Sequence, residues 1–178
     1  MKRFMDWLTG EAKGAGPVLG YVVFAALVVV SLDYAVKAAL ENWGLVQPAP
    51  LPKVGETPFR YFNTFMFISL FVWGPVKEEV IFRVLPLSIV IAFVSRSPWV
   101  IFGAMTVFAG LFGAIHPYGL IGKVDVAIGG FFFGLVFLKC GGLNKSFVKA
   151  SACAMAAHAL TNVFVVLDAW WEYFESVL

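Results

Sequence analysis

Two adjacent glutamates and an arginine, Glu78, Glu79 and Arg83, lie in a stretch of sequence that is mostly apolar. A charge in the middle of a membrane helix costs about 2.5–3.5 kcal/mol on insertion scales, so such residues are usually functional or paired. Glu79 and Arg83 are four residues apart and share a helix face, whereas Glu78 is rotated by about 100° from Glu79. We therefore predict that Glu78 is a catalytic base and that the Glu79–Arg83 pair supports it. The alternative is an ordinary ion network in the headgroup region.

The sequence contains two histidines, and both occur in apolar segments. His116 ends an apolar run that begins at Leu111. His158 is followed four residues later by Asn162, which places both on one helix face. A single histidine in such a place more often has a packing role, with its ring hydrogen-bonded in the core. Two histidines together with the paired glutamates favour a functional site.

The composition predicts that the chain lies in a bilayer. Of its 178 residues, 61% are hydrophobic and 13% charged, and the mean hydropathy is +0.87. A soluble domain carries about 25% charged residues. We expect an all-α fold: a polytopic membrane helix bundle of about six transmembrane segments with a four-helix catalytic core. The expected segments are residues 17–40, 59–73, 75–94, 98–116, 123–139 and 146–168.

Prolines and glycines set several of these boundaries. Gly74-Pro75 is expected to separate two helices, because proline suits the first turn of a new helix. Residues 47–53 alternate with prolines and are expected to be an extended loop. Gly130 and Gly134 are spaced for close helix packing. We expect one integral-membrane domain over residues 1–178, with residues 17–40 as a retained peripheral span and 59–168 as the core that bears the site.

The expected boundaries place the unusual polar residues in one layer of the bundle. Glu78 would lie about 5 Å from the start of its helix, and Asn162 and His158 about 9 and 15 Å from the end of theirs. Successive segments cross the membrane in opposite directions, so these ends meet at one face, where His116 ends its own segment. The sequence therefore predicts that four separated residues converge near one side of the bilayer.

This set of side chains suits the hydrolysis of an amide bond. Glu78 can take a proton from water, and His116 can share or relay that proton. His158 and Asn162 can donate hydrogen bonds to a developing oxyanion. A zinc ion held by Glu78, His116 and His158 is the alternative. The usual HExxH spacing is absent from the sequence, so we expect no cofactor.

The three motifs resemble those of the CPBP family, the CAAX proteases and bacteriocin-processing enzymes, also called the abortive-infection family. Its EExxxR motif reads here as residues 78–83, its FxxxH motif as 112–116 and its HxxxN motif as 158–162. The resemblance implies a glutamate-dependent intramembrane endopeptidase. It assigns water activation to Glu78 and His116 and oxyanion stabilisation to His158 and Asn162. The residues that it implies as supporting the site are Glu79, Arg83 and Phe112.

The sequence also departs from that family in two ways. Val84 follows the arginine where many members have glycine, and the chain is shorter than the eukaryotic prenyl-protein proteases. We therefore expect a protein or peptide substrate with a membrane-associated segment, cut near its C-terminal or membrane-embedded part, such as a sorting tail or a peptide precursor. The expected location is the inner membrane of a prokaryotic cell.

Two other functions are compatible with these residues. One is a catalytically silent membrane scaffold or bacteriocin-immunity protein of the same fold. The other is a proton-coupled carrier, because buried glutamate and histidine can relay protons. Nucleic acid is not an expected partner, because the net charge of +2 provides no broad basic face. The lysines and arginines are nearly balanced between the two expected membrane faces, so no orientation is assigned.

Overall fold

The computed structural model describes residues 7, 10–44 and 64–177, and all of the regular elements in those residues are helical. The expected loop at 47–53 and the expected start of a segment at residue 59 lie outside the described residues. The all-α fold class is confirmed for the part of the chain that the structure describes.

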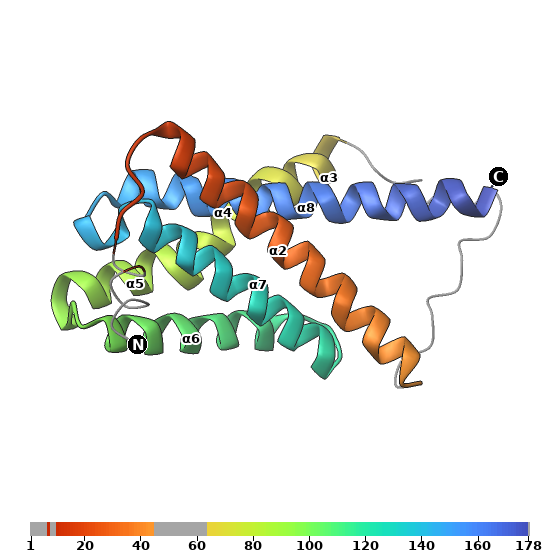
Figure 1. Ribbon diagram of the computed structural model, residues 1–178, viewed down its shortest axis with the longest axis horizontal. Coiled ribbons are helices and arrows are strands. Elements are labelled where there is room, and N and C mark those ends of the chain that lie inside the picture. The colour runs from red at the N-terminus through yellow and green to blue at the C-terminus, as the bar shows by residue number, and fades with distance from the viewer. Residues whose placement is uncertain (1–6, 8–9, 45–63, 178) are drawn as a thin grey trace.

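Long helical stretches make up the described fold (Figure 1). Four of them are α-helices: α2 (Ala15–Asn42), α6 (Pro98–Ile115), α7 (Leu120–Lys139) and α8 (Phe147–Val177). Residues 64–94 form a fifth stretch, here named the glutamate helix. It contains α3 (Thr64–Ile68), η1 (Ser69–Trp73), α4 (Gly74–Glu79), η2 (Val80–Val84), α5 (Leu85–Ile89) and η3 (Val90–Val94). A short 3₁₀ turn, η4 (Gly142–Asn144), precedes α8.

The glutamate helix is continuous, so the predicted break at Gly74-Pro75 is wrong. Trp73 has φ −68° and ψ −44°, and Gly74 has φ −57° and ψ −61°, both in the right-handed helical region. The turn before the proline is π-helical, with the Gly74 N–H bonded to the Ser69 carbonyl. This wider turn carries the helix past a proline that would otherwise interrupt it.

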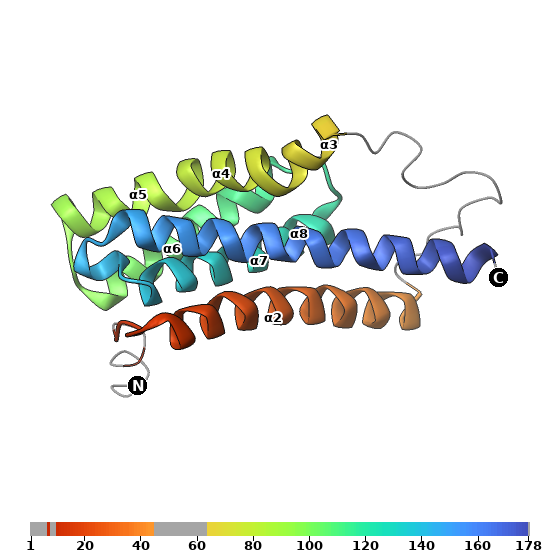
Figure 2. The ribbon, with the colours of Figure 1, turned by 90° about the horizontal axis from the view of Figure 1, so that it is seen from above.

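The continuity of this helix also corrects the expected position of Glu78. This residue lies about four helical turns after Thr64 and not near a helix start. His116 still ends its helix, as predicted, because it is the residue that follows α6. The glutamate helix, α2 and α8 therefore all continue past the level at which α6 ends (Figures 1 and 2).

α7 and α8 occupy the centre of the bundle. α7 packs against α6, α2 and α8, and α8 lies between α2 and the glutamate helix (Figure 2). One buried apolar cluster joins the glutamate helix to α6, α7 and the start of α8: Leu87, Ile91, Ile101, Met105, Phe137, Leu138, Ala150 and Ala154. A second cluster joins α2 to α7 and α8: Val22, Ala25, Val29, Phe133, Val136, Cys140 and Ala157.

Glycines allow α6 and α7 to approach each other closely. A Cβ on Gly134 would lie 2.6 Å from Cγ of Met105, and a Cβ on Gly113 would overlap the Lys123 carbonyl. The close helix packing predicted for Gly134 is therefore present. This contact fixes where α6 ends relative to α7, and hence where His116 lies.

The exterior of the bundle is apolar. Phe93, Leu120 and Val148 are 84%, 80% and 87% exposed. Among the described residues, α2, α6, α7 and α8 each contain a stretch long and apolar enough to cross a membrane. An exterior of this kind needs lipid around it. The chain is an all-α integral membrane protein. The expected number of six spans is not confirmed, because segments 59–73 and 75–94 share one helix.

Residues 10–14, which directly precede α2, contact the ends of α7 and η4. The Ala12 N–H donates to the Lys139 carbonyl at 2.8 Å. The Glu11 carboxylate accepts hydrogen bonds from Asn144 and from Nζ of Lys149, the latter at 3.1 Å. This attachment holds the N-terminal end of α2 against the end of the bundle that lies away from His116.

Candidate active site

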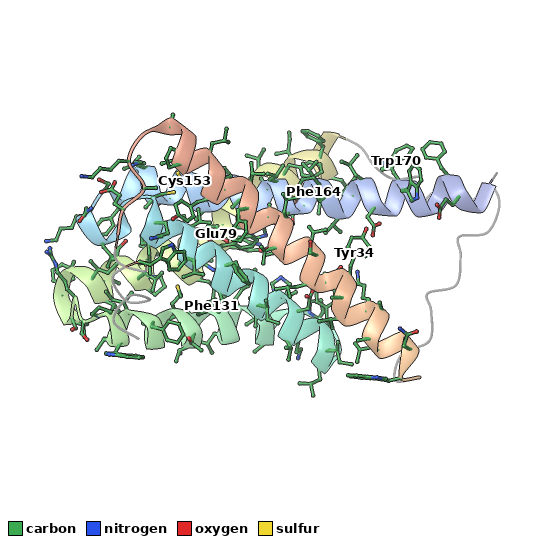
Figure 3. The ribbon with its side chains drawn as sticks, in the orientation of Figure 1. Tyr34, Glu79, Phe131, Cys153, Phe164 and Trp170 are labelled. Atoms are coloured by element: carbon green, nitrogen blue, oxygen red, sulfur yellow. The ribbon has the colours of Figure 1, made fainter. Side chains whose placement is uncertain are left out.

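Glu79 and Arg83 form an ion pair in the interior of the bundle, where Figure 3 shows Glu79. Their side chains are 0% and 2% exposed, and Nη1 of Arg83 lies 2.9 Å from Oε1 of Glu79. The predicted pairing is confirmed. Nδ1 of His158 lies 2.9 Å from the same oxygen. Because a carboxylate only accepts hydrogen bonds, this Nδ1 carries the proton, and α8 is bonded to the glutamate helix.

The guanidinium of Arg83 is enclosed by α6 and α7. Its Nε donates to the Gly130 carbonyl at 3.2 Å, and its Cζ lies 3.9 Å from the ring centroid of Phe112. A Cβ on Gly130 would overlap Nη2 of Arg83 and lie 2.9 Å from Cδ1 of Phe112. Only glycine at position 130 leaves room for the arginine in this place. Phe112 thus supports the ion pair through a cation–π contact.

His158 lies between the two glutamates. Its ring stacks on Phe133, with centroids 4.7 Å apart and planes at 15°. Its Nε2 faces Oε2 of Glu78 at 3.7 Å, which is longer than a hydrogen bond. Contacts of this kind often shorten only when substrate binds. The Glu78 side chain is 23% exposed, whereas that of Glu79 is fully buried, so only Glu78 can meet a ligand.

His116 follows the last residue of α6 and bonds back to that helix. Its Nδ1 lies 2.7 Å from the Phe112 carbonyl, one of the last carbonyls of α6. A carbonyl only accepts, so Nδ1 carries the proton, and in the neutral ring Nε2 keeps a lone pair. The ring stacks on Tyr118, with centroids 5.8 Å apart. This geometry leaves Nε2 able to take a proton from a ligand or from water.

Asn162 lies one helical turn after His158 and contacts the glutamate helix. Its Nδ2 donates a hydrogen bond to the Leu70 carbonyl at 2.7 Å. A carboxamide nitrogen has two N–H groups, so this bond leaves one for a ligand.

One cavity of about 510 Å³ brings the candidate catalytic residues together. Glu78, His116, His158 and Asn162 all line it, although they come from two helices, the glutamate helix and α8, and from the residue after α6. The cavity is also lined by Val29, Val30, Asp33, Lys37, Leu70, Phe112, Tyr118, Gly122, Asp125, Val126, Gly129, Phe133, Thr161 and Val165. The predicted convergence of acid, imidazole and amide groups is present, and their catalytic roles stay predictions.

A second hollow lies on another side of Glu78 and His116. It measures about 470 Å³ and is also lined by Lys77, Phe82 and Pro117. Glu78 and His116 therefore border both hollows, and a ligand in either hollow can contact these two side chains.

Sequence reasoning missed several residues that shape the cavity. Gly130 was assigned only to helix packing, although it also accepts the Arg83 hydrogen bond. Asp33 and Lys37 form a 2.6 Å ion pair that lines the cavity together with Asp125 of α7. The four-residue spacing of Asp33 and Lys37 in an apolar segment was a visible signal, of the same kind as Glu79 and Arg83. Phe133 carried no such signal.

The described residues contain no group of three histidine, cysteine, aspartate or glutamate side chains that could hold a metal ion. The zinc alternative requires Glu78, His116 and His158 as ligands. In both histidines Nδ1 already has a hydrogen-bond partner within the protein. Their Nε2 atoms would have to serve as the ligands. The expectation of no cofactor stays a prediction, and metal analysis of the purified, chelator-washed protein tests it against the zinc alternative.

A membrane-embedded helix bundle with carboxylate, imidazole and carboxamide groups in one cavity has the side chains that an intramembrane hydrolase requires. The family model of Rce1-like type II CAAX prenyl endopeptidases matches residues 60–164, which is more than half of the chain. The protein belongs to this family, as the three sequence motifs predicted. No curated protein and no solved structure gives a significant match. At the level of the family, the chain is a peptidase of the CAAX-protease type.

Proposed function

We propose that the protein is an intramembrane endopeptidase in which Glu78 and His116 activate a water molecule. One observation carries the proposal: a partly exposed carboxylate and an imidazole with a free Nε2 line the same cavity as His158 and Asn162. The second glutamate is sealed behind this cavity by Arg83 and is not available to a ligand.

The reaction follows from the donors and acceptors in the cavity. Water attacks the carbonyl carbon of the scissile amide, and its proton passes to the Glu78 carboxylate or to Nε2 of His116. The carbonyl oxygen becomes an oxyanion, which accepts a hydrogen bond from the remaining N–H of Asn162. The C–N bond then breaks, and the leaving nitrogen takes the proton held by Glu78 or His116.

His158 completes this site through its Nε2. Because Nδ1–H is held by Glu79, the ring donates to an oxyanion only when Nε2 is protonated as well. A positive charge on this ring would lie between the carboxylates of Glu78 and Glu79. The two carboxylates thus favour a hydrogen-bond donor at Nε2 of His158 in the transition state.

The cavity supports a substrate that enters from lipid. The exterior of the bundle is apolar, and Asp33, Lys37 and Asp125 add charged groups to the cavity lining. We propose a protein or peptide with a membrane-associated segment, cut near its C-terminal or membrane-embedded part. The proposed location is the inner membrane of a prokaryotic cell.

The test compares membrane proteomes of cells that carry the native protein, Glu78→Gln or Glu175→Gln. Glu78→Gln keeps the side-chain shape and removes the base, whereas Glu175 is an exposed glutamate near the end of α8. Mass spectrometry of new protein termini should show peptides that vanish in Glu78→Gln and persist in Glu175→Gln. If all termini and the cellular phenotype persist in Glu78→Gln, the silent-scaffold alternative replaces the proposal.

A further inference from the structure

The Leu70 carbonyl lacks both of the N–H groups that normally reach a carbonyl from the next helical turn. In an α-helix its donor would be the Gly74 N–H, but that group bonds to Ser69, one residue further back. The donor that would continue the π pattern lies at position 75, which is proline and has no N–H. Leu70 therefore presents its carbonyl oxygen to groups outside the helix.

Gly74 is the second requirement of this arrangement. A Cβ at this position would lie 2.8 Å from the Ser69 carbonyl oxygen, a backbone atom that cannot move without moving the helix. Glycine permits the close approach of Ser69 that redirects the Gly74 N–H. The Gly74-Pro75 pair thus frees one carbonyl within a continuous helix.

Asn162 bonds to this carbonyl from α8. The 2.7 Å hydrogen bond uses one of its two N–H groups and fixes the plane of its carboxamide. One turn earlier on α8, His158 bonds to Glu79 of the same helix. α8 and the glutamate helix are therefore joined at two points, and both contacts come from residues that line the cavity.

We infer that Gly74 and Pro75 are positioning residues: they free the Leu70 carbonyl, which holds the Asn162 carboxamide with its second N–H available to the cavity. They contact no substrate in this scheme and act through Asn162. The inference rests on the proposed function for its activity readout, and on geometry alone for its spectroscopic one.

The same helix provides a matched control. Pro86 follows a second π-helical turn, η2, in which the Leu85 N–H bonds to the Val80 carbonyl. Replacing either proline by alanine adds one N–H to the helix after a π-turn. Pro75→Ala supplies that N–H next to the turn that Asn162 contacts, whereas Pro86→Ala does so about three turns away.

The first readout is the NMR signal of the Asn162 side chain in protein labelled with ¹⁵N-asparagine. The chain has four asparagines, Asn42, Asn63, Asn144 and Asn162, so loss of one signal in Asn162→Ala identifies it. Pro75→Ala should shift this signal and speed its hydrogen exchange, because the Leu70 carbonyl gains a donor within the helix. Pro86→Ala should leave the signal unchanged. An unchanged signal in Pro75→Ala overturns the inference.

The second readout is a double-mutant cycle on peptide cleavage. Pro75→Ala should lower kcat about tenfold with KM within about twofold, the effect of one misplaced transition-state hydrogen bond. The double variant Pro75→Ala/Asn162→Ala should be no slower than Asn162→Ala. If the double variant instead loses activity by the product of the two single-variant factors, the inference is overturned. A chain without peptidase activity that still shows the NMR shift refutes the proposed function alone, so the two failures are distinguishable.

Discussion

Two neighbouring glutamates have opposite surroundings, and helix geometry explains the difference. Glu79 shares the face of Arg83 and is fully buried, with one oxygen bonded to both Arg83 and His158. Glu78 is turned by about 100° and borders both hollows. Removing one partner of a buried ion pair leaves an uncompensated charge, whereas neutralising an accessible acid does not. Substitutions at the two positions should therefore separate stability from activity.

We expect Arg83→Met to lower the free energy of unfolding by about 3–5 kcal/mol, because it leaves Glu79 charged and buried. Glu78→Gln should change it by less than about 1 kcal/mol while abolishing cleavage. Denaturant unfolding in detergent, paired with a peptide-cleavage assay, measures both. Equal loss of stability in the two variants would show that Glu78 is also part of the buried network.

Gly130 offers a second test at the residue scale. Gly130→Ala should displace the Arg83 guanidinium and cost about 1–3 kcal/mol of stability, because the new Cβ overlaps Nη2. Gly110→Ala, on α6, meets no atom within 4 Å and should be neutral or slightly stabilising, since alanine favours helix. Thermal unfolding of both variants checks the prediction. Similar melting temperatures would mean that the arginine has another place to lie.

Spacing along one helix predicted more of the site than contacts between helices could. The Glu79–Arg83 pair and the shared face of His158 and Asn162 follow from four-residue intervals. The roles of Gly130 and Phe133 around Arg83 and His158 depend on how α7 is rotated against its neighbours. No property of a single segment determines that rotation.

At the scale of elements, the rule that proline ends a helix was too simple for Pro75. A π-turn before the proline keeps the backbone helical and moves the unsatisfied carbonyl to Leu70, where Asn162 bonds to it. The six predicted segments therefore correspond to five helical stretches among the described residues. The boundaries at Pro98 and at Lys139 were predicted correctly, because the backbone leaves the helical region there: Ser97 is extended, with a ψ of 127°, and Gly141 has a φ of 109°.

The contact of α6 with α7 predicts a large effect for one glycine. Gly113→Ala should destabilise the protein by about 1–3 kcal/mol or more, because its Cβ meets the backbone of α7 at Lys123 and cannot be accommodated by a side-chain rotation. Gly103→Ala on the same helix meets nothing within 4 Å. Unfolding midpoints in detergent measure the difference. A Gly113→Ala protein as stable as Gly103→Ala would mean that α6 slides easily along α7.

At the scale of the whole molecule, composition predicted a membrane protein because its apolar surface has no other stable solvent. The orientation in the membrane could not be predicted in the same way, since it depends on an asymmetry of basic residues that this sequence lacks. The attachment of the N-terminal residues to the far end of the bundle was also not predictable, because it joins positions more than a hundred residues apart.

This attachment should depend on pH through Glu11. Hydrogen bonds from Asn144 and then Lys149 hold the pKa of this carboxyl below its usual value. A lowered pKa in the folded state means that the attachment is fully stabilised above the ordinary carboxyl pKa and weakens as the pH falls through the lowered one. Hydrogen–deuterium exchange at Ala12, corrected for intrinsic rates, should rise in that acidic range. Glu11→Gln should show no such rise, and an identical rise in this variant would contradict the assignment.

The charges of the glutamate helix have a consequence for how the protein is made. Lys77, Glu78, Glu79 and Arg83 each oppose partition into lipid by about 2.5–3.5 kcal/mol when a segment enters alone. Glu79 and Arg83 pair within this helix, but the Gly130 carbonyl and the His158 ring, which complete the hydrogen bonds of that pair, are synthesised later. We therefore expect that the translocon inserts this helix into the bilayer late. Nascent chains that stop before α8 should leave the glutamate helix outside the bilayer, and release of the completed chain should allow its insertion.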